Sequence, residues 1–500
     1  MARRILLVNW DNYPNVAGGG VYTWVRDFVD GMKDCEFHVF HQLSNSSVNA
    51  KYETPPSVKE VIELPIYGTN RYQEYYNEGP GLTRRILRTN EGIVRDGFIP
   101  LYSAFLDEVL SDESDPAKLT DLVYAIHRFL LVYDFKKCFE DSLTWRIFSK
   151  KVQADPFYAN MNLKAALTLY QVILRSLQIL SIRVPDVDLV HCSLAWWPCL
   201  LAVCAKKDQG IPMMITEHGG AYRELIFYYD AAFADDAAKT LWRSFSRNVV
   251  KCAYLNTDMI VPVCKTNASW AYYLGAEPSK VRVIYNGIDT KKFNPSLAPE
   301  SRKRPTIVSV GRIIIYKDIL GLIRAVKIVK ATFPDVLCLA YGEAIEMDYA
   351  KQCVKEVEGL GLEGSFYFKG RTDEPQKAYN EGDVVAFSSV AEGFPYAIIE
   401  AMACGKAIVA NAVGGVAEAL EGVGILVPSL NPSEFAEALI SLLKNPELRE
   451  RFGRLARAKA VEKFELSGML ANYDAAYNEL LAKSRRLQMG RASLGGAVTV

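Results

Sequence analysis

Two glutamates separated by seven residues, Glu392 and Glu400, are the side chains whose type and spacing most strongly suggest chemistry in this sequence. Glu392 lies in a predicted loop, and Pro395 suits the first turn of a helix that starts there. The free amides and positive dipole end of that helix favour a phosphate. Glu400 would lie one to two turns into the helix, where a carboxylate can accept both hydroxyls of a ribose. The segment therefore predicts a site for a nucleotide that carries a sugar, with Gly393, Phe394 and Pro395 along it.

The alternative for these two acids is that both are ordinary helix-entry residues. A helix dipole favours negative charge near its first turn, which is sufficient to explain Glu392. It does not explain Glu400, which falls among the apolar residues of 398–402. We therefore expect Glu400 to contact ribose and Glu392 to contact a sugar hydroxyl.

A diphosphate also needs fixed positive charge, and two cations follow a predicted strand at 306–310. Arg312 comes two residues after that strand, and Lys317 five residues later. Both would lie at the carboxyl end of a parallel strand, which is where open α/β sheets bind ligands. Taken alone, the pair could be ordinary surface cations in a loop, but the carboxylate segment favours a role at the diphosphate.

The elements that must position these side chains are short apolar runs bounded by polar residues, a pattern typical of buried parallel strands. In the first half, such strands are predicted at 4–8, 36–40, 189–191, 213–216, 259–262 and 281–284. Gly18 and Gly19 follow the first of them and precede a helical pattern. In the second half, strands are predicted at 306–310, 336–339, 365–368, 384–387, 407–410 and 425–427.

This alternation predicts an α/β protein with two doubly wound, Rossmann-like domains facing each other across a cleft. We expect the first domain at 1–295, with a mostly helical insertion at about 72–182, and the second at 303–465. A polar, proline-containing stretch between them is typical of a linker. A final helix at 466–484 is expected to pack back on the first domain, and 485–500 to be a disordered tail.

The composition excludes several classes of protein. Lys+Arg and Asp+Glu both number 58, so no overall field would attract nucleic acid or an anionic membrane. The ten cysteines include no C-x-x-C pair, which indicates buried thiols in a reducing compartment rather than disulfides or a zinc site. The first apolar run is too short for a signal peptide, so we expect a cytoplasmic protein, with contact to a membrane left open.

The motifs together resemble the GT-B glycosyltransferases of family 4. The resemblance rests on EGFPYAIIEAMACGKAIVA followed by VGGVAE, on GR and Lys317 upstream, and on NGID at 286–289. It implies a GT-B fold, a retaining transfer from a nucleotide sugar, and no metal or other cofactor. It implies that Gly18 and Gly19 approach the donor phosphates and the reacting sugar. Arg312 and Lys317 would neutralise the diphosphate leaving group.

The first half narrows the resemblance to the PelF-type exopolysaccharide glycosyltransferases, through NYPNVAGGGVYTWVRDFVDGM and ITEHGGAYRE. This implies UDP-glucose as the donor and a growing polysaccharide or other glycan as the acceptor. A membrane-embedded polysaccharide synthesis or export protein is then a candidate partner. Trp196 and Trp197 depart from the small, glycine-containing turn of relatives, so they are candidates for the acceptor side, where they could stack on a sugar, although core packing would explain them equally well.

The remaining candidates lie at the ends of predicted strands in the first half. The resemblance implies that His191 lies near the reacting sugar, whereas a hydrogen-bonded structural histidine is the alternative. Glu217, His218 and Arg223 are candidates for the acceptor side, and a loop network of ion pairs is their alternative. Asp186 and Asp188 formally match a metal-binding D-x-D, but they precede a strand, so we expect them to bind no metal.

Two other functions compete with sugar transfer. A nucleotide-sugar 2-epimerase would use a similar two-domain cleft, but it would need acid and base groups at C2 of the sugar. A non-catalytic, sugar-nucleotide-binding subunit of a polysaccharide-export complex would be expected to lose some of the site residues. Arg312, Lys317, Glu392 and Glu400 are all present, which favours the enzyme.

Overall fold

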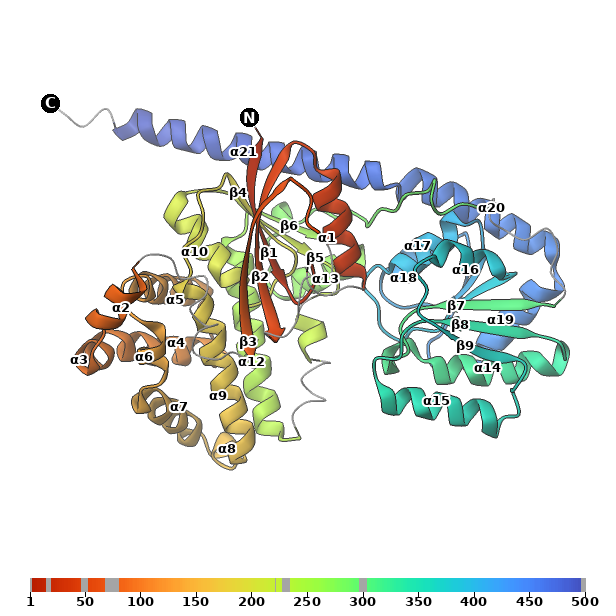
Figure 1. Cartoon of the computed structure of the whole chain (residues 1–500), viewed down its shortest axis with the longest axis horizontal. Coiled ribbons are helices and arrows are strands. Elements are labelled where there is room, and N and C mark those ends of the chain that lie inside the picture. Colours follow the sequence, from red (N-terminus) through yellow and green to blue (C-terminus); the bar gives the residue numbers. More distant parts are fainter. Residues whose placement is uncertain are drawn as a thin grey trace. The chain divides into compact units, whose positions relative to one another are not determined.

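A computed structural model describes residues 2–14, 19–45, 53–67, 81–220, 222–226, 234–295 and 304–495 (Figure 1). The chain divides into two compact units. Unit 1 comprises Met1–Pro262, Ala268–Arg282 and Asp474–Val500, and unit 2 comprises Val263–Asn267 and Val283–Tyr473. Each unit is built around its own sheet.

The sheet of unit 1 has six strands in the order β3-β2-β1-β4-β5-β6, and every pairing is parallel. The strands are β1 Arg3–Trp10, β2 Cys35–Asn45, β3 Val58–Tyr67, β4 Leu189–Cys192, β5 Met213–Glu217 and β6 Met259–Pro262. The apolar residues at 5–8 of β1 are almost completely buried, as expected for a strand covered on both faces. The order reverses at β1, which makes the sheet doubly wound, as predicted.

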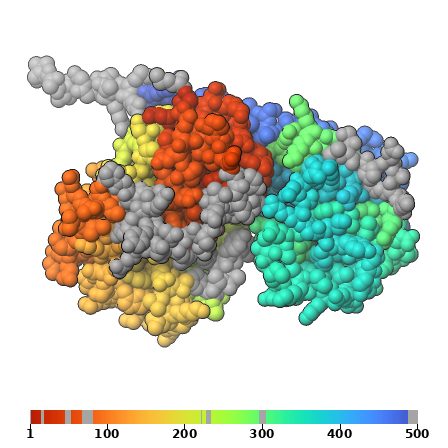
Figure 2. Space-filling view, in the orientation of Figure 1, coloured from red at the N-terminus to blue at the C-terminus, as the bar shows by residue number. Residues whose placement is uncertain are grey.

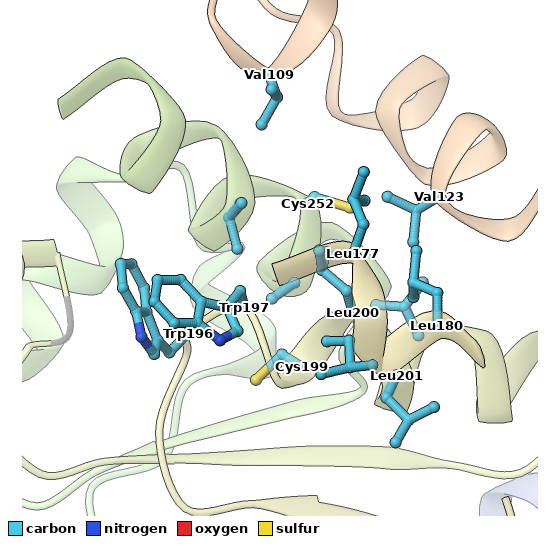
Figure 3. Close-up of a cluster of buried hydrophobic side chains, with 14 of the residues drawn as sticks. Val109, Val123, Leu177, Leu180, Trp196, Trp197, Cys199, Leu200, Leu201 and Cys252 are labelled. Atoms are coloured by element: carbon cyan, nitrogen blue, oxygen red, sulfur yellow. The ribbon is translucent and has the colours of Figure 1, made fainter. Parts of the chain in front are cut away.

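Helices of unit 1 that connect or cover these strands are α1 Gly20–Gly31, α10 Cys199–Gln209, α12 Asp236–Asn256, α13 Lys265–Tyr273 and the short 3₁₀ turn η4 Pro278–Lys280. α13 begins in the part of the chain assigned to unit 2. The turn between β4 and α10 carries Trp196 and Trp197, which lie side by side next to Cys199 and Leu200 (Figure 3). All four side chains belong to the hydrophobic core of unit 1.

The described residues between β3 and β4 are mostly helical. Their helices form one continuous region of the surface, coloured orange and yellow (Figure 2). Its members are α2 Leu82–Arg88, α3 Glu91–Ile93, the π-helical turn η2 Val94–Phe98, α4 Ile99–Val109, α5 Pro116–Leu130, α6 Phe135–Phe139, α7 Ser142–Ala154, α8 Pro156–Ala159, α9 Leu163–Gln178 and η3 Ile179–Ser181.

Side-chain capping explains where many of these helices begin. An Asp or Asn side chain accepts a hydrogen bond from a free backbone N–H in the first turn, which stabilises the helix start. The caps are Asp115 for α5, Asp134 for α6, Asp141 for α7, Asp155 for α8 and Asn162 for α9.

The sheet of unit 2 also has six parallel strands, in the order β12-β11-β10-β7-β8-β9. The strands are β7 Thr306–Val310, β8 Leu337–Tyr341, β9 Phe366–Gly370, β10 Val384–Phe387, β11 Ala407–Asn411 and β12 Ile425–Val427. The helices are η6 Ile315–Lys317, α14 Ile319–Thr332, α15 Met347–Gly359, α16 Pro375–Glu381, α17 Tyr396–Ala403, α18 Gly415–Leu420, α19 Pro432–Lys444 and α20 Pro446–Lys463. α21 Leu466–Gly495 continues from unit 2 into unit 1. All six strands predicted for this half are present.

Two predictions about elements are wrong. The strand predicted at 281–284 is reduced to one bridge between Val281 and Ile260, because the chain passes from unit 1 to unit 2 after Arg282 and leaves the sheet. The tail predicted to be disordered from 485 is helical as far as Gly495. Good helix formers such as Arg485, Arg486 and Leu487 continue α21 there.

The ten cysteines are free and buried, as predicted. Within the parts of the chain that the structure describes, no helix is long and apolar enough to cross a membrane.

Candidate functional site

Lys317 and Glu392 meet at the carboxyl ends of neighbouring strands in unit 2. Lys317 ends η6, which follows β7, and its Nζ forms an ion pair with Oε1 of Glu392, in the loop after β10. The two side chains are 15% and 10% exposed. Nζ also lies 5.2 Å from the ring centroid of Phe387, an attractive position for a cation. The structure therefore brings together the cation and the carboxylate that the sequence singled out.

Backbone and hydroxyl contacts fix the two loops that carry this pair. The Ser388 hydroxyl donates to the carbonyl oxygen of Lys317 at 2.8 Å, and the Val390 amide donates to that of Tyr316 at 2.9 Å. Arg312 is exposed and donates to the Tyr316 hydroxyl at 2.8 Å. The Arg312 guanidinium is therefore accessible to a ligand, whereas Lys317 is held largely out of water.

The glycine pair of the VGGVAE motif supports the Glu392 loop by close approach. A Cβ on Gly414, which has φ of 50°, would lie 2.0 Å from the Glu392 carbonyl oxygen. The Gly415 amide donates to the Gly393 carbonyl at 2.7 Å. A larger residue at Gly414 would displace the loop, so the close approach of the two segments requires glycine there.

The loop then leads directly into α17. Pro395 precedes the helix, and Phe394 is 4% exposed, with its ring packed on Tyr285 and Phe464 at centroid distances of 5.0 and 5.2 Å. The Asn286 side-chain amide donates to the Phe394 carbonyl at 2.9 Å. The NGID motif thus holds the helix entry in place, and the Phe394 side chain serves packing.

Glu400 is half-buried on α17, whereas its neighbours Ile399 and Ala401 are completely buried. Its Oε2 accepts a hydrogen bond of 2.8 Å from the hydroxyl of Tyr379, on α16. No sequence motif points to Tyr379, because it lies 21 residues away from Glu400 along the chain.

His191, at the end of β4, is completely buried in unit 1. Its Nδ1 lies 2.7 Å from the hydroxyl of Tyr477, on α21, and its Nε2 lies 2.8 Å from the hydroxyl of Thr216, on β5. Burial, together with the nearby His218, lowers the pKa of His191 to about 3. Here the ring joins β4, β5 and α21, and a role at the reacting sugar stays a prediction.

We expect His191 to make stability depend on pH. The unfolded chain binds a proton at this residue below its ordinary pKa of about 6.5, whereas the folded chain does not until the pH approaches 3. The stability that the neutral ring contributes is present above pH 6.5 and is lost as the pH falls. Urea unfolding at pH 7, 6 and 5 measures how steeply the free energy of unfolding changes with pH. In His191→Asn this slope should be smaller than in the wild type by up to about 1.4 kcal/mol per pH unit.

Tyr477→Phe is the matched control for that experiment, because it removes the contact to Nδ1 but keeps the titrating ring. It should lower stability at every pH and keep the slope. An unchanged slope in His191→Asn would contradict the burial of a neutral ring at this position.

The other candidates in unit 1 are also buried or packed. Glu217 is 1% exposed and accepts a hydrogen bond of 2.7 Å from the Tyr254 hydroxyl. His218 lies edge-on to Trp24 at 4.7 Å, and burial lowers its pKa to about 3. Arg223 is half-buried. The side chains of 217 and 218 thus hold the end of β5 in its place.

Trp196 and Trp197 are each 2% exposed, whereas stacking on a sugar would require an exposed ring face. The Trp197 indole donates to Gln42 Oε1 at 2.6 Å and packs edge-on against Trp10 at 4.7 Å. Core packing, the alternative weighed for this pair, is what the structure shows. The physical reason is that α12 supplies further aromatic side chains, such as Trp242, which enclose the turn.

The remaining predicted site residues are two glycines and two aspartates in unit 1. Gly19 precedes α1 with φ of 96°, and Gly18 lies outside the described residues. Asp186 and Asp188 form ion pairs with Arg4 at 2.9 and 2.8 Å. Among the residues that the structure describes, no group of three or more His, Cys, Asp or Glu side chains is arranged to hold a metal ion.

Two families match the chain, one in each half. Residues 3–279 match the family described as Domain of unknown function (DUF3492), and residues 291–459 match the family Glycosyl transferases group 1. The chain therefore belongs to the DUF3492 family, whose match spans more than half of it, and its second half carries a Glycosyl transferases group 1 domain.

Curated relatives match over a part of the chain. The chain is 30% identical over 226 residues to the N-acetylgalactosamine-N,N'-diacetylbacillosaminyl-diphospho-undecaprenol 4-alpha-N-acetylgalactosaminyltransferase of Campylobacter jejuni, covering 44% of the chain and 60% of the relative. It is 31% identical over 202 residues to the D-inositol 3-phosphate glycosyltransferase of Paenarthrobacter aurescens, covering 38% and 49%. The chain thus spans between about half and three-fifths of these two relatives.

Solved structures show the same fold over nearly the whole chain. Anabaena HepE in complex with UDP has a TM-score of 0.59 at 17% identity, covering 95% of this chain and 100% of that one. Sucrose-phosphate synthase from Thermosynechococcus elongatus has a TM-score of 0.62 at 18% identity, covering 96% and 100%. These likenesses confirm the predicted GT-B fold.

Proposed function

We propose that this protein is a GT-B glycosyltransferase whose unit 2 binds a nucleotide-sugar donor. The observation that carries the proposal is the Lys317–Glu392 pair at the carboxyl ends of β7 and β10, followed by Glu400 on α17. In the proposed complex, Lys317 and Arg312 contact the diphosphate, Glu392 a hydroxyl of the donor sugar, and Glu400 the ribose. The Glycosyl transferases group 1 match over 291–459 covers these four residues.

The chemistry proposed is departure of a nucleoside diphosphate from the anomeric carbon of the sugar. Negative charge grows on the diphosphate as the bond from the anomeric carbon to oxygen breaks, so preorganised positive charge there lowers the barrier. Lys317 and Arg312 supply that charge from the protein, and the backbone amides at the start of α17 add to it. The proposed reaction therefore needs no metal ion.

We further propose that the transfer is retaining. The acceptor hydroxyl would attack on the face that the diphosphate leaves, a new bond from carbon to oxygen would form there, and the acceptor proton would pass to the leaving phosphate. This route needs no protein carboxylate as a nucleophile, which is compatible with Glu392 being held by Lys317. Nuclear magnetic resonance of the product's anomeric proton measures the outcome.

The donor proposed is UDP-glucose, and the acceptor is a growing polysaccharide or other glycan. The support is the resemblance to PelF-type enzymes, together with HepE, which has been solved with UDP-glucose. We also propose a cytoplasmic location and contact with a membrane-embedded polysaccharide synthesis or export protein. The support for these two proposals is the same resemblance.

Donor screening tests the proposed function. The purified protein is incubated with UDP-glucose, UDP-galactose, UDP-N-acetylglucosamine and GDP-mannose, and release of nucleoside diphosphate is followed. We expect turnover of UDP-glucose, reduced at least tenfold by Glu400→Ala because a charge-assisted hydrogen bond to ribose is lost.

The matched control is Glu437→Ala, which removes an exposed carboxylate from α19 of the same unit and should leave turnover unchanged. Failure to bind or turn over any donor would contradict the proposed function. Conversion of UDP-glucose to its C2 epimer would show a 2-epimerase instead, and binding without turnover would favour a non-catalytic subunit.

A further inference from the structure

Tyr379 is a completely buried tyrosine on α16 whose hydroxyl contacts the site. The hydroxyl lies 2.8 Å from Oε2 of Glu400, within the normal range for a hydrogen bond to a carboxylate. Of the two groups, the phenol is the donor and the carboxylate the acceptor. The half-buried Glu400 side chain is thus hydrogen-bonded to a residue in the interior of unit 2.

The phenol remains a donor at any working pH. Burial raises the pKa of Tyr379 well above its ordinary value of 10, and the nearby Glu400 carboxylate raises it further. A hydroxyl that stays neutral keeps its proton available for the carboxylate.

The position of the Tyr379 ring is set by contacts of its helix with the chain around it. The buried ammonium of Lys406, which follows α17, donates to the carbonyls of Asn380 and Gly382 at 3.4 and 3.1 Å. The Asn380 side-chain amide donates to the Gln376 and Asn294 carbonyls, each at 2.9 Å. α16 therefore cannot shift freely relative to α17, and the phenol is fixed with it.

We propose that Tyr379 is a positioning residue for ribose recognition: it holds the Glu400 carboxylate in one orientation so that the carboxylate is ready to accept the ribose hydroxyls. A free glutamate side chain loses substantial rotamer entropy when a ligand orders it. Anchoring one oxygen before the ligand arrives removes part of that cost, and so increases affinity. The inference rests on the proposed function, because it assumes that Glu400 faces ribose.

The experiment compares two ligands that differ in their ribose hydroxyls alone. Binding of UDP and of 2′,3′-dideoxy-UDP is measured by calorimetry for the wild type, Tyr379→Phe and Glu400→Gln. We expect Tyr379→Phe to weaken UDP about tenfold, the usual scale for loss of one hydrogen bond to a charged group. The affinity for 2′,3′-dideoxy-UDP should stay as in the wild type. The preference for ribose, which is the ratio of the affinity for UDP to that for 2′,3′-dideoxy-UDP, should therefore fall.

Tyr341→Phe is the matched control, because its hydroxyl donates to another carboxylate, that of Glu381, at the same distance of 2.8 Å. It should leave the preference for ribose unchanged. The double variant Tyr379→Phe/Glu400→Gln should lose no more of that preference than Glu400→Gln alone, since the two residues act as one unit.

Each alternative outcome has a definite meaning. If Tyr379→Phe weakens both ligands equally, or neither, Tyr379 has at most a structural role and the inference is wrong. If Glu400→Gln itself keeps the full preference for ribose, or if the wild type binds no UDP, the assignment of Glu400 in the proposed function fails as well. Loss of the preference in Glu400→Gln but not in Tyr379→Phe overturns the inference alone.

Discussion

Replacing Lys317 by alanine is expected to lower kcat/KM for sugar transfer by about 10²- to 10³-fold, the scale found when one preorganised group that stabilises transition-state charge is removed. The Lys317 side chain is 15% exposed, so its interaction with a diphosphate would be screened little by water. The negative charge on the leaving group is larger in the transition state than in the bound donor, and the loss should therefore appear mainly in kcat. Initial rates of UDP release over a range of UDP-glucose concentrations measure it.

The substitution also leaves the Glu392 carboxylate, 10% exposed, without its ion-pair partner. Removing one member of a buried pair can destabilise a fold by about 3–5 kcal/mol, so activity and stability must be separated. Lys317→Gln serves this purpose, because an amide can still donate to the carboxylate but carries no charge. It should unfold close to the wild-type temperature and still lose activity.

Lys327→Ala is the matched control, since Lys327 lies exposed on α14 of the same unit and donates to the Leu360 carbonyl. Its kcat/KM should equal that of the wild type. Full activity in a folded Lys317→Gln protein would remove Lys317 from the diphosphate site and leave Arg312 as the remaining proposed cation.

The sequence predicted unit 2 well because its signals are local. Each strand is a short, continuous apolar run, and parallel strands place the residues that follow them at one edge of the sheet. Lys317 and Glu392 follow β7 and β10, which are direct neighbours, so two separate loops had to approach each other. Predicting that these two loops meet requires the order of the strands in the sheet, but no other knowledge of long-range packing.

What the sequence did not reveal depends on contacts between distant segments. Tyr379 reaches Glu400 because α16 packs against α17, a relation that no spacing along the chain encodes. His191 was weighed as a residue near the reacting sugar, yet both ring nitrogens are hydrogen-bonded within the core, one of them to α21, far along the chain. The strand predicted at 281–284 fails for a similar reason, since the boundary between units interrupts it.

Trp196 and Trp197 show most clearly that a sequence pattern does not predict contacts between distant segments. An aromatic pair at the end of a strand can stack on a sugar or pack in the hydrophobic core. The burial of the two rings distinguishes these roles. Burial depends on the aromatic side chains that other elements bring to this turn, here Trp10 from β1 and Trp242 from α12. Because those residues are distant in sequence, the sequence alone is compatible with both sugar stacking and core packing.

Trp197→Ala is accordingly expected to lower the free energy of unfolding by about 3–5 kcal/mol, the usual cost of replacing a buried tryptophan by alanine. The indole is 2% exposed, and its removal would also leave the side-chain oxygen of Gln42, a residue 1% exposed, without its donor. Urea unfolding followed by circular dichroism measures the loss. Trp197→Phe keeps an aromatic ring and should cost less, so it is the graded control. An acceptor role would instead predict weaker acceptor binding at nearly unchanged stability; that result in Trp197→Ala would show that the ring is not part of the core.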